Sequence, residues 1–162
     1  MEVLSTAGLL EVTPLTEGIN HVNIYSKSST ELGRGLSHFS SYGITNHHGQ
    51  FASLEAYWYW LATGKRFFEL AKLTGYAAKK AGRSHPVVPS DNFQQEFLAA
   101  IRLRFKQNPK LWSLFKTNEL PLTHYYYFGE PDNAKIIHST KHDWLLVEYK
   151  RLIDLTNLGK KK

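Results

Sequence analysis

One carboxylate, Glu55, stands among large apolar and aromatic side chains in the stretch FASLEAYWYWLATG, residues 51–64. Ser53 predicts the start of a helix, so Glu55 lies near the positive end of the helix dipole, which stabilises an anion. No lysine or arginine follows at positions 58 or 59 to pair with it. A carboxyl group in such a setting has a raised pKa or is held by specific donors, and both conditions are typical of functional sites. The plainer interpretation is an ordinary acidic residue in a first helical turn.

A basic stretch, GYAAKKAGR at residues 75–83, carries a second possible chemistry. Gly82 lets a ligand approach the backbone closely, and Arg83 can bind a phosphate with two parallel hydrogen bonds. A lysine shielded by an apolar wall has a lowered pKa and becomes an amine nucleophile that can form a Schiff base with a sugar aldehyde, which makes Lys79 or Lys80 a candidate. The alternative is a solvated basic helix face.

The stretch ELGRGLSHF at residues 31–39 places Arg34 between two glycines, which suits a loop that cradles an anion. It lacks the spacing of a phosphate-binding P-loop or a dinucleotide fingerprint. The eight histidines form no HExxH pattern. We expect the adjacent His47 and His48 to point in different directions, and we expect neither a metal site nor a cofactor.

Composition narrows the class of protein. The 162 residues include no cysteine, which excludes disulfides, a thiol nucleophile and zinc sites with sulfur ligands. No apolar run approaches the length of a membrane span, and the first residues lack the basic start of a signal peptide, so we expect a cytoplasmic protein with no membrane partner. A net charge of +6 favours polyanionic partners, and 14% aromatic residues provide flat surfaces on which bases stack.

The apolar spacing predicts an α+β fold: a single helix-rich domain over residues 1–162, with a few short strands. We expect a strand at 21–25, loop at 26–43 and a β-hairpin from 123–129 and 134–140. Helices are predicted from the Ser53 cap to Gly64, at 65–73, at 76–82, from Asp91 to Pro109 with an Asp91–Gln94 capping box, at 110–117, and from Thr140 to about Leu155. Residues 159–162 form a basic tail that we expect to be frayed.

Several motifs in order resemble one known family. They are IYSKSSTELGRGLSHFS, FASLEAYWYW, AAKKAGR, FLAAIRLRFKQNP, TNELPLTHYYYFG and HDWLLVEYKRLI, which span about residues 23–153. This order is similar to that of the NADAR family, also called YbiA-like and named for a proposed link to NAD and ADP-ribose metabolism. The resemblance implies the fold of that family and an N-glycosidase that cleaves the bond between C1 of a ribose and a nitrogen.

The resemblance also implies site residues. Glu55 matches the acidic residue of the S-x-E-x-Y helix, and Lys79, or less closely Lys80, matches the basic residue of A-K-x-L-G-R. Gly82 and Arg83 match the end of that motif.

Three positions depart from the family pattern. Ala81 replaces the Leu of A-K-x-L-G-R, which suggests looser packing behind the basic helix. Ser37 and Phe39 match L-S-N-F, but His38 replaces the Asn, whose hydrogen bond a histidine would make with a different reach. Arg104 stands where many members have Lys, in a helix that we interpret as scaffold.

One branch of the family removes ADP-ribose from guanine bases of DNA and so reverses a DarT-type toxin, in antitoxins or phage counter-defence. We expect this activity, with Glu55 as the anion that stabilises the cationic transition state and Lys79 as the nucleophile. Arg34 and Arg83 would bind the pyrophosphate. Tyr57, Trp60 or Trp144 would stack on adenine or on the modified base.

The expected partner is therefore ADP-ribosylated DNA, preferably single-stranded, or ADP-ribose itself. Two alternatives stay open. One keeps the chemistry on ribosylamino-pyrimidine phosphates of riboflavin synthesis. The other is a non-catalytic module that binds ADP-ribose or nucleic acid. The oligomeric state does not follow from the sequence.

Overall fold

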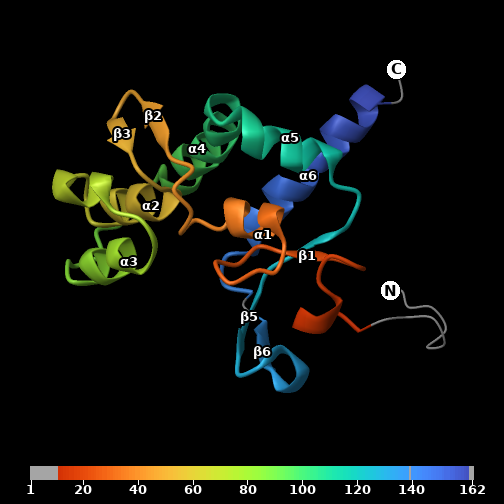
Figure 1. The fold of residues 1–162 in the computed structure, drawn as a ribbon. Helices are drawn as coiled ribbons and strands as arrows, with labels where there is room; N and C mark the ends of the chain where they lie inside the picture. Colours follow the sequence, from red (N-terminus) through yellow and green to blue (C-terminus); the bar gives the residue numbers. More distant parts are fainter. Residues whose placement is uncertain (1–10, 139, 161–162) are drawn as a thin grey trace. The chain divides into compact units, whose positions relative to one another are not determined.

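The computed structural model describes residues 11–138 and 140–160 and confirms an α+β fold in which helices dominate and strands are short (Figure 1). These residues form two compact units. Unit 1 comprises the described residues up to Arg34 and from Lys116 onward, and unit 2 comprises Gly35–Phe115. The single domain expected over 1–162 stays a prediction.

Unit 2 contains most of the helices. A hairpin of β2 (Ile44–Asn46) and β3 (Gly49–Phe51) is followed by α2 (Leu54–Ala62), the 3-10 helix η2 (Phe68–Lys72), α3 (Gly75–Arg83), α4 (Phe93–Gln107) and α5 (Pro109–Thr117). A short helix, α1 (Glu31–Leu36), and α5 each continue across a boundary between the units.

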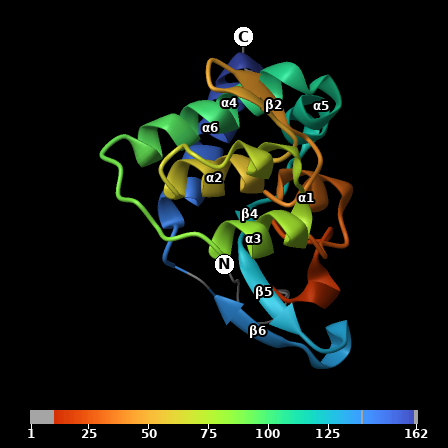
Figure 2. The ribbon, with the colours of Figure 1, turned by 90° about the vertical axis from the view of Figure 1, so that its left-hand side faces the viewer.

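Helix α2 is central to unit 2 because it is apolar on several sides. It contacts α3, α4, β3 and η2, and Figure 2 shows α2 and α3 side by side. Four of its side chains, Leu54, Ala56, Tyr57 and Leu61, are fully buried. Ser53 begins the helix as the sequence predicts, since its Oγ accepts a hydrogen bond of 3.1 Å from the Ala56 N–H.

Unit 1 is held together by short strands. Strand β1 (Val22–Asn23) pairs in parallel with β4 (Leu122–Thr123), and β5 (Tyr125–Phe128) pairs antiparallel with β6 (Lys135–His138), as the predicted hairpin requires. The unit also contains the 3-10 helices η1 (Pro14–Thr16) and η3 (Pro131–Asn133) and the helix α6 (Asp143–Lys160). The buried Asn23 joins both strand pairs, because its amide donates to the Tyr125 carbonyl and accepts from the Tyr125 N–H, each at 2.9 Å.

Four local predictions are wrong. The strand expected at 21–25 is only two residues long, and the loop expected at 26–43 contains α1. The helix expected at 65–73 is the shorter 3-10 helix η2, because Lys65 has a positive φ of 61° and Phe67 lies outside the helical region. The capping box expected at Asp91–Gln94 does not form, because the N-cap of α4 is Asn92, whose side chain makes no capping hydrogen bond.

The last helix extends further than predicted, through Lys160, and residues 161–162 of the expected tail lie outside the described residues. In the part of the chain that the structure describes, every helix is too short or too polar to cross a membrane.

Candidate active site

The start of α2 fixes the position of Glu55. The Glu55 N–H, one of the amides that a helix leaves unpaired in its first turn, donates to the His38 carbonyl oxygen at 2.9 Å. Ser53 adds a second anchor, since its hydroxyl donates to the Leu73 carbonyl at 2.8 Å. Both contacts hold the backbone around Glu55, so the position of its side chain does not depend on α2 alone.

Burial controls the charge of Glu55. Removal from water raises the pKa of the Glu55 carboxyl from 4.5 to about 7, and the positive charges of Lys79 and Arg83 work in the opposite direction. The desolvation is the larger effect. The carboxyl group can therefore gain or lose a proton near neutral pH, as a general acid or base must.

Helix α3 supplies the cations. Lys79 and Arg83 are four residues apart and so lie on one face of the helix, while Lys80 is rotated by about 100° from Lys79. Lys79 is half-buried, and Lys80 and Arg83 are exposed. The structure therefore brings Lys79 and Arg83 near Glu55.

The close contact between α2 and α3 depends on Gly82. A Cβ atom at this position would lie 2.1 Å from Cγ of Tyr59. Because only hydrogen fits there, the ring of Tyr59 rests directly on the backbone of α3. The role of Gly82 is thus to let α3 pack closely against α2.

Tyr59 is a member of this cluster that the sequence reasoning missed. Burial and the nearby Glu55 raise the pKa of its phenol, whereas a hydrogen bond with Arg83 lowers it. The signal was available, because Tyr59 is four residues after Glu55 and therefore on the same face of α2. We call Glu55, Tyr59, Lys79 and Arg83 the acid–base cluster.

The Ser37–His38–Phe39 segment supports both helices through its backbone. The His38 carbonyl accepts from Glu55, and the Phe39 carbonyl accepts from the Gly75 N–H at 3.1 Å, at the start of α3. Ser37 is buried and its Oγ accepts from the Phe39 N–H at 3.2 Å. The His38 ring packs edge-on against Phe97. The described contacts of this segment position the acid–base cluster.

Arg104 fixes the same segment from α4. Its guanidinium is fully buried and donates to the carbonyl oxygens of Leu36 at 2.8 Å and Ser37 at 3.2 Å. These carbonyls lie at the end of α1, where a helix leaves acceptors unpaired, and the Ser37 carbonyl also accepts from the Ser40 N–H at 3.1 Å. The scaffold role expected for this helix is consistent with that contact.

Two predicted stacking residues are in the core. Tyr57 has no exposed surface, and Trp60 is 7% exposed and packs against Phe51. A ring that is covered on both faces has no surface on which a base can stack. This burial argues against the stacking role expected for Tyr57 and Trp60, and we leave both out of the site.

The remaining two predicted residues belong to unit 1. Arg34 is exposed and its Nη1 donates to the Ser28 carbonyl at 2.9 Å. Trp144 is half-buried on α6. The anion-binding loop was expected at residues 31–39, of which Glu31–Leu36 form α1. The loop just before α1 binds the carboxylate of Glu17 through the Thr30 hydroxyl at 3.0 Å and through the Ser28 hydroxyl. The hydroxyl groups of this loop therefore bind a carboxylate of the protein itself.

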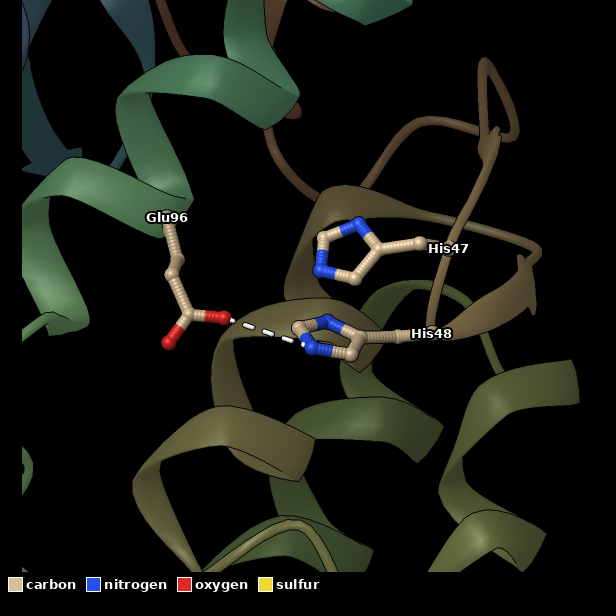
Figure 3. Close-up of side chains that lie close together, drawn as sticks. All are labelled: His47, His48 and Glu96. Atoms are coloured by element: carbon tan, nitrogen blue, oxygen red, sulfur yellow. Dashed lines mark ion pairs between the residues drawn. The ribbon is translucent and has the colours of Figure 1, made fainter.

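A second polar group lies on the other side of α2. His47 and His48 form the turn of the β2–β3 hairpin, with ring centroids 3.9 Å apart, and Glu96 faces them from α4 (Figure 3). The expectation that the two rings point in different directions is wrong, because alternation applies to extended strands and these residues occupy a turn. Burial is the main cause that lowers the pKa of His48.

No family model matches the sequence, and no curated protein matches it. The fold is similar to the NMR structure of the E. coli protein YbiA, with a TM-score of 0.61 over 88% of each chain. The chain has the YbiA fold. The fold that the motif resemblance implied is thus confirmed, while the 20% sequence identity to YbiA leaves the activity to be argued from the site.

Proposed function

We propose that the protein is an N-glycosidase that hydrolyses the bond between C1 of a ribose and a nitrogen. The observation that carries this proposal is the half-buried Glu55 beside the cationic face of α3, with a carboxyl group whose pKa desolvation raises. When a nitrogen leaves C1, positive charge develops on C1 and the ring oxygen. A carboxylate held nearby in a desolvated setting stabilises that charge strongly.

The raised pKa of Glu55 gives the residue a second capacity. Near pH 7 both forms are populated, because its pKa is about 7. The protonated form can donate a proton to the departing nitrogen, and the ionised form can then activate water. One carboxyl group therefore suffices for both proton transfers.

Lys79 is the proposed nucleophile. The Lys79 ammonium first gives a proton to the Glu55 carboxylate. The neutral amine then attacks C1 as the C1–N bond breaks, and the leaving nitrogen takes the bonding electron pair and the proton that Glu55 holds. The sugar ring opens when the C1–O bond breaks, which leaves an imine between C1 and Lys79 and a new hydroxyl. Water then adds to the imine carbon, the amine departs, and free sugar is released.

The proposed substrate is ADP-ribose attached to guanine in single-stranded DNA. Charge supports a polyanion at this unit: residues 35–115 contain ten lysines and arginines against four acidic residues, whereas the rest of the chain contains ten of each. The whole excess of +6 therefore belongs to the unit that carries Glu55. Arg83 would bind the pyrophosphate, and the roles of Arg34 and Trp144 in unit 1 stay predictions.

The deciding experiment incubates the protein with single-stranded DNA that carries ADP-ribosylated guanine and measures restored guanine and free ADP-ribose. We expect release by the parent and loss of release in Glu55→Ala. Release from a ribosylamino-pyrimidine phosphate, with none from DNA, would assign the chemistry to a small metabolite. Tight binding without release from either substrate would overturn the proposal in favour of a binding module.

A further inference from the structure

The β2–β3 turn and the first part of α4 place three metal-ligating side chains together. The ligand atoms of His47, His48 and Glu96 all lie within 4.8 Å of one another. His48 Nε2 is 3.4 Å from Glu96 Oε2. Figure 3 shows both imidazole rings on the side that faces Glu96, one above the other.

We propose that His47, His48 and Glu96 bind a zinc ion. Two imidazoles and one carboxylate are donors that suit Zn²⁺, and a set of three protein ligands leaves a fourth position for water or a small ligand. This site is separate from the acid–base cluster. Tyr57, the residue of α2 that contacts His48, lies about 200° around the helix from Glu55.

The hairpin geometry preorganises the two histidines. Asn46 pairs with Gly49 in the ladder, so His47 and His48 are the two residues of a tight turn. Gly49 has a φ of 132°, a conformation that glycine adopts without strain. The turn is also tied down at Asn46, whose side chain accepts from the His48 N–H at 2.9 Å. Both rings are therefore held on one side of the turn.

A buried phenol holds the second nitrogen of His48. His48 Nδ1 is 3.0 Å from the hydroxyl of Tyr57, which has no exposed surface. Histidines that bind metals usually have their other ring nitrogen fixed by such a partner, which sets the ring orientation. In the tautomer in which His48 Nδ1–H donates to Tyr57, the lone pair of Nε2 faces Glu96, where a cation would satisfy both acceptors.

The two oxygens of Glu96 have different partners. Oε1 accepts from Lys65 Nζ at 2.8 Å, and Oε2 faces His48. Lys65 therefore orients the carboxylate and leaves one oxygen for the metal. Its own positive charge also repels the ion, so that removal of this charge should strengthen metal binding.

The site needs only a small adjustment to close. With bonds of about 2.0–2.1 Å, two ligands of a tetrahedral zinc ion lie about 3.4 Å apart. His48 and Glu96 already have this separation. His47 is exposed, so its ring can rotate to complete the set without disturbing the core.

The proposed ion borders a hollow of about 400 Å³. His47 and Glu96 line it together with Asn46 and Gln95, and Ala99, Ala100 and Leu103 form its apolar part. The fourth position of the metal is thus open to water and to a small ligand of this size.

The test uses the full chain without an affinity tag, freed of metal by a chelator. Zn²⁺ binding is measured by calorimetry, and Co²⁺ binding by its visible absorption, which reports coordination geometry. We expect one zinc ion per chain and the absorption of a four- or five-coordinate Co²⁺ site. Mg²⁺ and Ca²⁺ should bind much more weakly, because imidazole does not suit them.

Variants assign the ligands. His47→Ala and Glu96→Gln should each weaken zinc affinity by tenfold or more, and Lys65→Met should strengthen it several-fold. His138→Ala, which removes an exposed histidine in unit 1, is the matched control and should change nothing. Circular dichroism of each metal-free variant verifies folding, and His47→Ala should fold normally because the residue is exposed. Absence of zinc binding in the parent, or equal zinc affinity in His47→Ala and the parent, would overturn the proposal.

Discussion

The backbone N–H of Glu55 donates a hydrogen bond of 2.9 Å to the carbonyl oxygen of His38. This contact joins the motif ELGRGLSHF to the motif FASLEAYWYW, and it uses no side-chain atom of His38. The replacement of Asn by His at position 38, relative to the resembled family, therefore leaves the anchor of Glu55 intact. The geometry of the acid–base cluster depends on backbone contacts at the starts of α2 and α3.

Glu55→Gln should change the pH dependence of stability. The folded-state pKa of about 7 lies above the value of 4.5 for an exposed carboxyl, so the folded protein holds this proton more tightly than the unfolded chain does. The stabilisation is complete below about pH 4.5 and is lost as the pH rises through 7. The variant cannot ionise, so it should be more stable than the parent by about 2–3 kcal/mol at pH 8 and should converge with it near pH 4.

Urea denaturation at several pH values measures this difference. Glu69→Gln, on the exposed surface of η2, is the matched control and should keep the pH profile of the parent. A constant difference between Glu55→Gln and the parent from pH 4 to 8 would show that burial does not shift the proton affinity of Glu55. Glycosidase activity should be lost in the same variant, whatever its stability.

Gly82→Ala should destabilise the protein and lower its activity. The new methyl group would overlap the ring of Tyr59, since its position is 2.1 Å from Cγ. Helix α3 must then move away from α2, at a cost of about 1–3 kcal/mol, and this shift separates Lys79 and Arg83 from Glu55. Gly159→Ala is the control, because nothing lies within 4 Å of that Cβ position.

The two glycines should have opposite effects on the free energy of unfolding. Gly159 lies in the last turn of α6, where alanine favours the helix by up to about 1 kcal/mol. Thermal unfolding of both variants measures the effects. A Gly82→Ala variant as stable and as active as the parent would contradict the close packing of α3 on α2.

The fold was predictable where periodicity was strong. Helix α2 begins at the predicted cap, and the β5–β6 hairpin lies where alternating residues flank EPDN. Helix α1 was missed because its two glycines, Gly33 and Gly35, are poor helix formers. They are present for packing: a Cβ at Gly33 would overlap the Asn23 carbonyl oxygen. Tertiary contacts therefore override local propensity at α1.

The candidate site was predictable in part. The apolar surroundings of Glu55 and the charges of residues 79–83 could be read from residue types, since burial and charge follow from composition. The Arg104 contacts could not, because they end on backbone carbonyls that every residue possesses. The burial of Trp60, which argues against the stacking expected of it, was not predictable, because an aromatic residue in a pattern can equally belong to the core.

Arg104→Met should destabilise the protein by about 1–3 kcal/mol, because it removes the guanidinium donor from the Leu36 carbonyl and leaves the Ser37 carbonyl with only the Ser40 N–H. Arg104→Lys keeps the charge but cannot make both hydrogen bonds, so we expect a smaller loss. Arg102→Met on the exposed face of α4 is the control and should change stability by less than about 0.5 kcal/mol. Equal stability of Arg104→Met and Arg102→Met would remove Arg104 from its anchoring role.

Lys79→Ala should abolish a covalent intermediate. Borohydride reduces an imine to a stable amine, so the parent incubated with substrate and borohydride should gain the mass of the sugar at Lys79. Lys80→Ala is the matched control, because Lys80 is exposed and is rotated away from Lys79 around α3. An adduct that persists in Lys79→Ala, or active turnover without any adduct, would remove the lysine from this step and leave water as the direct nucleophile.

Substrate binding should weaken steeply with salt if the partner is DNA. Release of counterions from the phosphates makes the logarithm of affinity fall linearly with the logarithm of salt concentration. Lys80 and Arg83 are exposed residues of unit 2, whose net charge is +6. Lys80→Gln and Arg83→Gln should each reduce the slope by about one. Lys150 is exposed in unit 1, where basic and acidic residues balance, so Lys150→Gln should leave the slope unchanged. A salt-independent affinity would favour a small metabolite, because only a long polyanion releases many counterions when it binds.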